Sequence, residues 1–410
     1  MPADLAVLGP GRLALPAARA ATAAGIQTVA VIPEPRAAAG LNAGRPPAGG
    51  PLTAPELRRM LAAGFSATSD PAALWRVRTA LVCAPGAEDA REAAWVLGPR
   101  LRPGSLVVLQ SPGEPGLTRQ VLLPLLEEAS GLRAGRGFHL ACALERPERG
   151  TPSARAARVI GGLTPACTEA AAAFYARLAD GRAAGRRATG DKVIRARGIA
   201  EAETLAALEA NLRHVTTALV NETAMLCHDL GIDLWDVLRC AEARLTGAAA
   251  ALRPGPAPAD AAGPVNPGGR LTLVGRAKSI NARMPGYVTD RAAALLNEHG
   301  KSARGARVLL LGVSGHDGAP GEPDPAAAEI AAGLRQLGAD LGFHDPRLPR
   351  WQVAGRPVAR AASPYEAAAD ADLTLLLAPH SVYDLQGLAA KAQLLFDTRG
   401  VTPAGTAHRL

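Results

Sequence analysis

Aromatic residues are scarce in this chain of 410 residues, which has five Phe, four Trp and four Tyr. Its cores must therefore be built from alanine, leucine and valine, and a surface that stacks nucleic-acid bases on aromatic rings is poorly supplied. Lysine is also scarce, although Lys and Arg together (45) exceed Asp and Glu (37). The many arginines are spread along the chain, which favours a solvated basic surface over a polyanion-binding patch.

Cysteines are few, and their spacing excludes a disulfide framework or a structural zinc site. The five show neither a C-x-x-C pair nor a neighbouring pair of histidines: Cys83, Cys142, Cys167, Cys227 and Cys240. No window approaches eighteen uncharged apolar residues, and the start MPADLAVLGPG has no basic segment before an apolar run. We expect a cytoplasmic protein that binds no metal, no membrane and no nucleic acid.

Alternating strand-like and helical segments make up most of the chain. Residues 4–32 have the pattern of a strand, a glycine turn, an alanine-rich helix and a second strand, and the alternation resumes after residue 305. From about Ala200 to Gly231 apolar residues recur three and four apart, as in a long helix. The pattern predicts an α/β fold with two Rossmann-like doubly wound domains joined by a long central helix, with boundaries at 1–198, 199–300 and 301–410.

The glycine turn of the first unit fits a dinucleotide-binding fingerprint. Gly9-Pro10-Gly11-Arg12-Leu13-Ala14 follows G-x-G-x-x-G/A, in which the first glycine turns the chain, the second admits a pyrophosphate, and the helix start faces the anion. Ile32 stands where an acid would bind the ribose hydroxyls. Glu34 or Arg36 could partly substitute for that acid, and Arg36 could favour a 2′-phosphate. The turn is either a competent dinucleotide site or a vestige. We expect NAD to bind weakly, with NADP no weaker.

Several strings resemble the UDP-glucose/GDP-mannose dehydrogenase family, in order over nearly the whole chain. They include LAVLGPG at 5–11, LRPGSLVVLQS at 101–111, RVIGGLTPACTEAA at 158–171, ALVNETAMLCHDLGID at 218–233 and SINARMPGYV at 279–288. The resemblance implies an N-terminal Rossmann domain for NAD, a central helix that forms a dimer, and a C-terminal domain for a nucleoside diphosphate. The family oxidises the C6 alcohol of a nucleotide sugar to a carboxylate in two hydride transfers.

The same resemblance shows catalytic groups that this chain lacks. The family's nucleophilic cysteine corresponds to Ala262, and the oxyanion-stabilising lysine and asparagine of the central helix correspond to Ala206 and Ala210. The position of the aspartate in the family's cysteine loop is occupied here by Asn266. The position of the family's Ser-Thr pair is occupied by Ser111-Pro112. The candidates that remain are Glu145 as an acid or base, Gly9, Gly11, Arg12, Leu13, Arg36 and Ser111 for the cofactor, and Arg146, Asn266 and Arg283 for the substrate.

Two functions remain open. The chain is either a non-catalytic homologue that binds a nucleotide, a nucleotide sugar or a partner protein, or a repurposed NAD(P)-dependent oxidoreductase that removes one hydride from another alcohol and needs no thiol. Both would be homodimers through the helix from about Ala200 to Leu230. On that helix, Asn221 and Glu222 are expected to be dimer contacts. Arg283 and the pair Asp397 and Arg399 would be domain-packing ion pairs or ligands.

Overall fold

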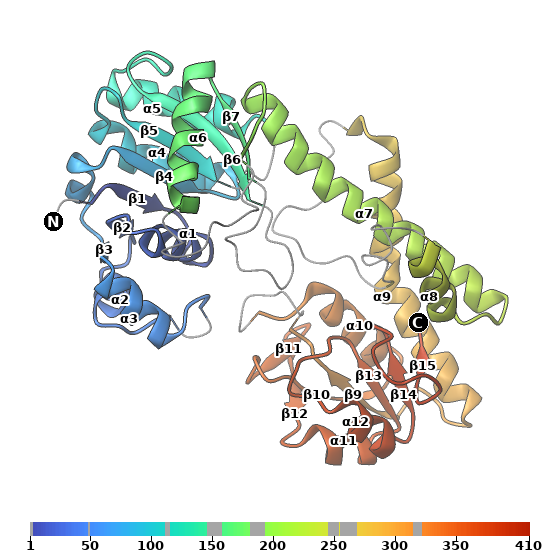
Figure 1. The fold of residues 1–410 in the computed structure, drawn as a ribbon. Coiled ribbons are helices and arrows are strands. Elements are labelled where there is room, and N and C mark those ends of the chain that lie inside the picture. Colours follow the sequence, from blue (N-terminus) through green and yellow to red (C-terminus); the bar gives the residue numbers. More distant parts are fainter. Residues whose placement is uncertain are drawn as a thin grey trace. The chain divides into compact units, whose positions relative to one another are not determined.

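Figure 1 shows the computed structural model of the chain, which describes residues 3–47, 50–110, 115–145, 158–180, 193–244, 254, 269–314 and 322–410. It divides into two compact units, Met1–Ala210 and Asn211–Leu410, which are described separately. The division falls within the long helix α7 (Ile199–Asp229). The three-part division at 198 and 300 stays a prediction.

The first unit is built on an eight-stranded sheet in the order β3-β2-β1-β4-β5-β6-β7-β8. All neighbouring strands in it are parallel except β6 and β7. The strands are β1 (Leu5–Leu8), β2 (Thr28–Val31), β3 (Phe65–Thr68), β4 (Thr79–Cys83), β5 (Leu106–Gln110), β6 (His139–Glu145), β7 (Arg158–Gly162) and β8 (Val193–Arg195). The first six follow the strand order of doubly wound dinucleotide-binding folds, in which ligands bind at the carboxyl ends of the strands.

Helices cover both faces of this sheet, as Figure 1 shows. They are α1 (Gly11–Ala23), α2 (Pro35–Asn42), α3 (Ala54–Ala62), α4 (Ala87–Leu97), α5 (Leu123–Ser130) and α6 (Pro165–Asp180), with short 3₁₀ segments η1 (Pro71–Arg76) and η2 (Gly98–Arg100) and a π-helical segment η3 (Leu117–Leu122). Leu5 and Val7 of β1 belong to the core on the side of α1, whereas Ala6 and Leu8 belong to the core on the side of α4. The strand is therefore apolar at every position, as expected for a parallel strand buried on both faces.

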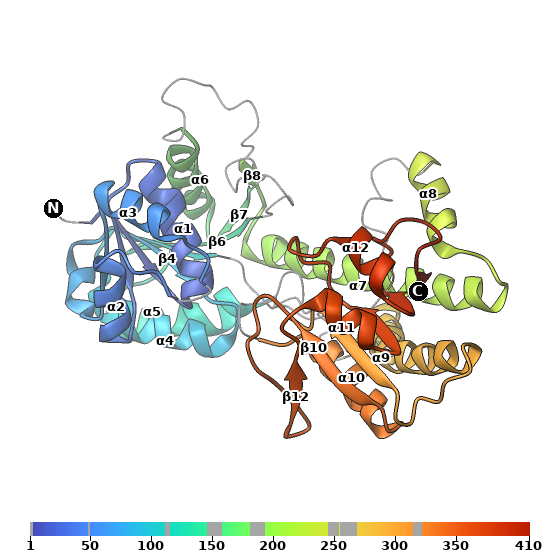
Figure 2. The same cartoon turned by 90° about the horizontal axis from the view of Figure 1, so that it is seen from below.

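The second unit contains a seven-stranded sheet in the order β11-β12-β10-β9-β13-β14-β15, parallel except for the β11–β12 hairpin. Its strands are β9 (Arg307–Leu311), β10 (Asp340–His344), β11 (Trp351–Val353), β12 (Arg356–Arg360), β13 (Leu373–Leu376), β14 (Leu395–Asp397) and β15 (His408–Arg409). Its helices are α8 (Leu234–Arg244), α9 (Thr272–Glu298), α10 (Pro325–Gln336), α11 (Pro364–Asp370) and α12 (Leu385–Lys391). One face is covered by α9 and α10, which lie side by side in Figure 2, and the other by α11 and α12. The predicted α/β fold class, with two doubly wound sheets and a long helix, is confirmed.

Helix α7 is apolar on two faces. Small residues such as Ala218, Val220 and Ala224 are buried, while a stripe of leucines is exposed: Leu208, Leu212, Leu219, Leu226 and Leu230. The chain leaves the helix at Gly231, whose φ of +67° is a conformation that glycine adopts without strain. In the described parts of the chain, no helix has both the length and the apolar character needed to cross a membrane.

Asn221 corrects one sequence-based expectation. Its side chain is fully buried and donates to Oδ1 of Asn281 on α9 at 3.0 Å, and Asn281 in turn donates to the carbonyl of His214 at 3.0 Å. Asn221 therefore joins α7 to α9 within one chain and does not face a partner subunit. Glu222, its neighbour, is exposed.

Candidate nucleotide site

Gly9 is required by the fold of the turn that follows β1. Its φ is +124°, and a Cβ atom built on it would lie 2.1 Å from the carbonyl oxygen of Cys83 at the end of β4. A side chain at this position would have to push the two strand ends apart. The first glycine of the fingerprint thus has a structural reason that involves no ligand.

The fold of the turn does not require a glycine at position 11. A Cβ atom built there would meet only Cδ1 of Leu15, at an ordinary 3.8 Å. The residue opens α1, whose preceding residue Pro10 supplies no side-chain cap. The amides of Leu13 and Ala14 donate to the carbonyl of Pro10 at 2.9 Å, whereas no described residue accepts from the amides of Gly11 and Arg12. Two backbone donors and the positive end of the helix dipole are therefore available to an anion.

A pocket of about 340 Å³ lies beside this turn, near the small end of the range of roughly 300 to 1,000 Å³ typical of ligand sites. Its walls come from the end of β1, the turn, α1, the end of β2, α2 with the segment after it, and α4: Leu8, Gly9, Pro10, Gly11, Leu15, Val31, Ile32, Pro33, Ala37, Leu41, Pro47, Asp89, Glu92, Ala93 and Val96. This is the edge of the sheet at which doubly wound folds bind dinucleotides.

The polar groups of this pocket were not foreseen from the sequence. Ile32 does line it, but Arg12, Leu13 and Arg36 do not, and the described lining includes no lysine or arginine. The charged side chains are two carboxylates of α4, Asp89 and Glu92. The available signal was their place in the first two turns of the helix after β4, because β4 lies next to β1 in this strand order.

Two of the predicted catalytic positions lie on α7 and carry only methyl groups. Ala210 is buried and Ala206 is half-buried, and the adjacent Asn211 is buried as well. A step of one residue rotates a side chain by about 100° around a helix, so Asn211 does not share the direction of Ala210. Arg283, on α9, is exposed.

The remaining predicted site residues fall largely outside the described residues. This is the case for Ser111, Arg146, Ala262 and Asn266, and for the side chain of Glu145. The backbone of Glu145 ends β6, and in the antiparallel register with β7 it lies directly opposite Arg158, a buried arginine stacked over the ring of Tyr175 at 5.5 Å.

The cysteines offer little accessible thiol chemistry. Four of the five are buried: Cys83, Cys142, Cys167 and Cys227. Burial, with a smaller contribution from the nearby charge of Glu203, raises the pKa of the Cys142 thiol well above its ordinary value, so it stays protonated. Cys240, on α8, is exposed.

Glu203 anchors the first turns of α7 to the first unit. Its fully buried carboxylate accepts hydrogen bonds from the amides of Gly116 (2.6 Å) and Thr118 (2.9 Å) and from the hydroxyl of Thr118 (2.6 Å). It thereby satisfies donors at the start of the π-helical segment η3. The contact sets the position of the α7 start, and with it that of Ala206.

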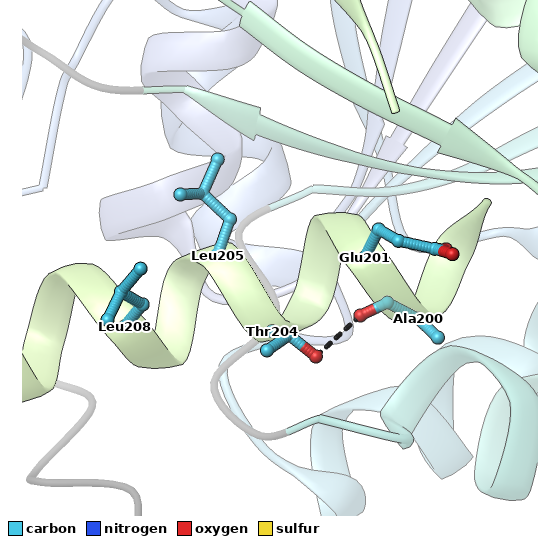
Figure 3. Close-up of a pocket in the computed structure, with 5 residues that line it drawn as sticks. All are labelled: Ala200, Glu201, Thr204, Leu205 and Leu208. Carbon is cyan, nitrogen blue, oxygen red and sulfur yellow. Dashed lines mark hydrogen bonds between the residues drawn. The ribbon is translucent and has the colours of Figure 1, made fainter. Parts of the chain in front are cut away.

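Figure 3 shows a second hollow, which is open and lies on the first turns of α7. Its volume is about 430 Å³, and its lining comes from that helix alone: Ala200, Glu201, Thr204, Leu205 and Leu208. The Thr204 hydroxyl donates to the carbonyl of Ala200 at 2.7 Å. With Glu201 as its single titratable side chain, this hollow presents no catalytic set. The described residues also contain no group of three or more His, Cys, Asp or Glu side chains that could hold a metal ion.

The second unit places a carboxylate at the end of its second strand, where a ribose-binding acid would stand in a dinucleotide fold. Asp345 follows β10, is fully buried, and accepts from the amide (2.8 Å) and hydroxyl (2.8 and 2.9 Å) of Ser314 and from the amides of Arg347 (2.8 Å) and Leu348 (3.1 Å). Burial raises its pKa, but hydrogen bonds from His380, Ser314 and Arg347 outweigh that effect and hold the pKa at about 2. Its oxygens are occupied by the protein itself.

This cluster is not a nucleophile–base relay. Nε2 of His380 faces both Asp345 Oδ2 (3.3 Å) and Ser314 Oγ (3.4 Å), whereas a relay uses the two ring nitrogens for different partners. Asp397 has a similar structural role, because it accepts from the amides of Arg399 and Thr402 and from the hydroxyl of Thr402, each at 2.8 Å. Both aspartates hold turns at the carboxyl end of the second sheet.

Comparison with known proteins places these features in a family. Residues 200–284 match the central domain of the UDP-glucose/GDP-mannose dehydrogenase family, and residues 324–404 match its UDP binding domain. The chain is 26% identical to UDP-N-acetyl-D-glucosamine 6-dehydrogenase of Pseudomonas aeruginosa over 61% of its own length and only 59% of that protein. It is 25% identical to UDP-N-acetyl-D-mannosamine dehydrogenase of Escherichia coli K12, covering 97% of this chain and 99% of that one.

A solved structure shares the whole fold. The UDP-D-ManNAc dehydrogenase of Pyrococcus horikoshii superposes with a TM-score of 0.81 at 21% identity, over 99% of this chain and 98% of that one. The matched central and C-terminal domains and this shared fold agree with the motifs found in the sequence. The chain belongs to the UDP-glucose/GDP-mannose dehydrogenase family, a family of nucleotide-sugar dehydrogenases.

Proposed function

We propose that this protein is a divergent family member that binds a nucleotide ligand at the glycine turn and does not oxidise the C6 alcohol of a nucleotide sugar to a carboxylate. The observation that carries the proposal is the pair Ala206 and Ala210 on α7, where the family resemblance calls for a lysine and an asparagine. Methyl groups cannot donate a hydrogen bond to a developing oxyanion, and removing a single such donor costs roughly a hundred- to a thousandfold in rate.

The missing thiol supports the same proposal. The sequence has alanine at position 262, and four of the five cysteines are buried elsewhere in the fold. A cysteine holds the intermediate aldehyde as a thiohemiacetal, from which the second hydride can leave. Without that covalent intermediate, the route from alcohol to acid stops after the first hydride.

The alternative is a two-electron NAD(P)-dependent oxidoreductase, which needs neither the thiol nor the thioester oxyanion donors. Gly11 supports the nucleotide site that both functions share, because the fold does not require a glycine there while a pyrophosphate approaching the start of α1 does. A nicotinamide held at this site would accept one hydride from an alcohol carbon. Glu145 is the residue that we propose as the acid or base in that case.

Product analysis tests the proposal. The purified protein is incubated with NAD and UDP-glucose, GDP-mannose or their N-acetyl relatives, and both NADH and the sugar product are measured. We expect no uronate above a control without protein. Steady uronate formation would refute the proposal, whereas one NADH for each aldehyde or ketone formed would favour the alternative.

A restoration series shows which missing group matters. We expect Ala262→Cys alone to restore no uronate formation, because the donors at positions 206 and 210 are still absent. The matched comparison is the triple variant Ala206→Lys, Ala210→Asn and Ala262→Cys. Uronate formation by the single variant would contradict the importance given to the two helix positions.

The same proposal includes a homodimer formed through α7. The leucines at 212, 219 and 226 are seven residues apart and between 56% and 63% exposed, so they form one apolar stripe along the helix. An exposed stripe of this length is typical of a surface that is covered by a partner.

A further inference from the structure

The nucleotide pocket has its carboxylates on the opposite side from the one expected in a dinucleotide fold. The end of β2 contributes Ile32, which accepts no hydrogen bond through its side chain, while α4 contributes Asp89 and Glu92. Asp89 lies in the first turn of α4 and is half-buried. The neighbouring pair Glu88 and Arg91 bond to each other at 2.6 Å and do not line the pocket.

These groups define the ligand that the pocket can accept. The amides of Gly11 and Arg12 at the start of α1 suit one anionic group, such as a pyrophosphate. The carboxylates of α4 suit a part of the ligand that is rich in hydrogen-bond donors, such as a ribose diol. A second phosphate near them would be repelled, and Arg36, which is exposed, is not part of the lining.

We infer that Asp89 replaces the missing acid of β2: it accepts hydrogen bonds from the ribose hydroxyls of an adenine dinucleotide, and together with Glu92 it excludes a 2′-phosphate. The pocket therefore selects NAD over NADP, which reverses the expectation drawn from Ile32 and Arg36 in the sequence. The inference rests on the proposed nucleotide-binding function, and it assigns the specificity of that site to a helix that the fingerprint does not include.

Calorimetric titration of NAD and NADP into the wild type and three variants tests the assignment. We expect the wild type to bind NAD at least about tenfold more tightly than NADP. Asp89→Asn should weaken the binding of NAD by roughly tenfold, because one charge-assisted hydrogen bond is lost. It should also reduce the preference for NAD, measured as the ratio of the affinities for NAD and NADP. Glu92→Gln should strengthen the binding of NADP, because it removes a charge that repels the 2′-phosphate. Glu88→Gln, on the same helix but outside the pocket, should change neither.

The outcomes distinguish a wrong role for Asp89 from a failure of the proposed nucleotide binding. If the wild type binds NAD and Asp89→Asn behaves like Glu88→Gln, the assignment of Asp89 is wrong, while the nucleotide site stands. A wild type that binds neither dinucleotide would overturn both the nucleotide site and this inference. Melting curves show whether each variant is folded. The ratio of the affinities for NAD and NADP is a further control, because a merely structural role of Asp89 would not change it.

Discussion

At the scale of single residues, the two glycines of the fingerprint answer to different constraints. We expect Gly9→Ala to lower the free energy of unfolding by at least about 2 kcal/mol, because its Cβ would collide with the Cys83 carbonyl at a positive φ. Gly11→Ala should leave stability unchanged or raise it by up to about 1 kcal/mol, since alanine is the better helix former. It should nevertheless weaken nucleotide binding by about tenfold or more. Denaturant unfolding and calorimetry measure the two effects.

The variants Gly9→Ala and Gly11→Ala serve as controls for each other. A Gly11→Ala protein that binds the dinucleotide as tightly as the wild type would mean that the ligand backbone does not approach the start of α1. A Gly9→Ala protein of wild-type stability would contradict the close approach of the turn to β4.

Asp345 makes the stability of the second unit sensitive to acid. Its pKa is about 2 in the folded state and near 3.8 when the chain is unfolded, so its ionised form adds about 2 kcal/mol of stability above pH 4. This contribution is lost as the pH falls from about 4 through 2, because the unfolded carboxyl takes up its proton first. We expect Asp345→Asn to flatten the fall in stability over that range, as measured by denaturant unfolding at a series of pH values.

Asp340→Asn provides the matched control for this prediction. Asp340 lies on the same strand, β10, but is exposed, so Asp340→Asn controls for the loss of one carboxylate outside the buried cluster. If the stability of Asp345→Asn falls in parallel with that of the wild type between pH 4 and 2, the ionised cluster is not the source of the acid sensitivity.

At the scale of elements, the exposed leucines of α7 predict the oligomeric state. Burying a leucine that is now more than half exposed is worth roughly 1 to 2 kcal/mol, and a two-fold interface would bury each leucine of the stripe once in each of the two copies. We expect light scattering to give about twice the chain mass of 41.9 kDa. Leu219→Glu or Leu226→Glu should shift the protein to the monomer, because a charge would be buried in the interface.

The control for the stripe is an exposed leucine placed elsewhere. Leu337, at the end of α10, is 40% exposed, and Leu337→Glu should leave the dimer intact. A wild-type mass near 41.9 kDa at micromolar concentration would contradict the dimer.

The elements also show where sequence reasoning succeeds. Helix α7 was predicted from about Ala200 with Gly231 at its end, and it spans Ile199–Asp229, because the spacing of three and four and a terminal glycine depend on local geometry. The expectation that Asn221 is a dimer contact was wrong because the spacing of three and four fits two faces of the helix equally well. Only the position of α9 decides which of them is buried.

At the scale of the whole molecule, periodicity and motifs along the chain are enough to predict the fold class and the family. Strand and helix periods, together with glycines at the turns, are local signals that accumulate along the chain, and they sufficed for two doubly wound sheets and the long helix. The substitutions Ala206, Ala210 and Ala262 are likewise visible without coordinates once the motifs are in register.

Which side chains share a pocket or a hydrogen bond depends on the packing of distant segments. Asp89 and Glu92 are more than fifty residues from Ile32 in the sequence, and they share a pocket with it because the strand order places β4 and β2 on either side of β1. Asp345 matches a ribose acid by position, yet its oxygens are taken by Ser314 and His380. Hydrogen bonding and pocket composition depend on distances between strands that no local pattern records, so the nature of the ligand site emerges only after folding.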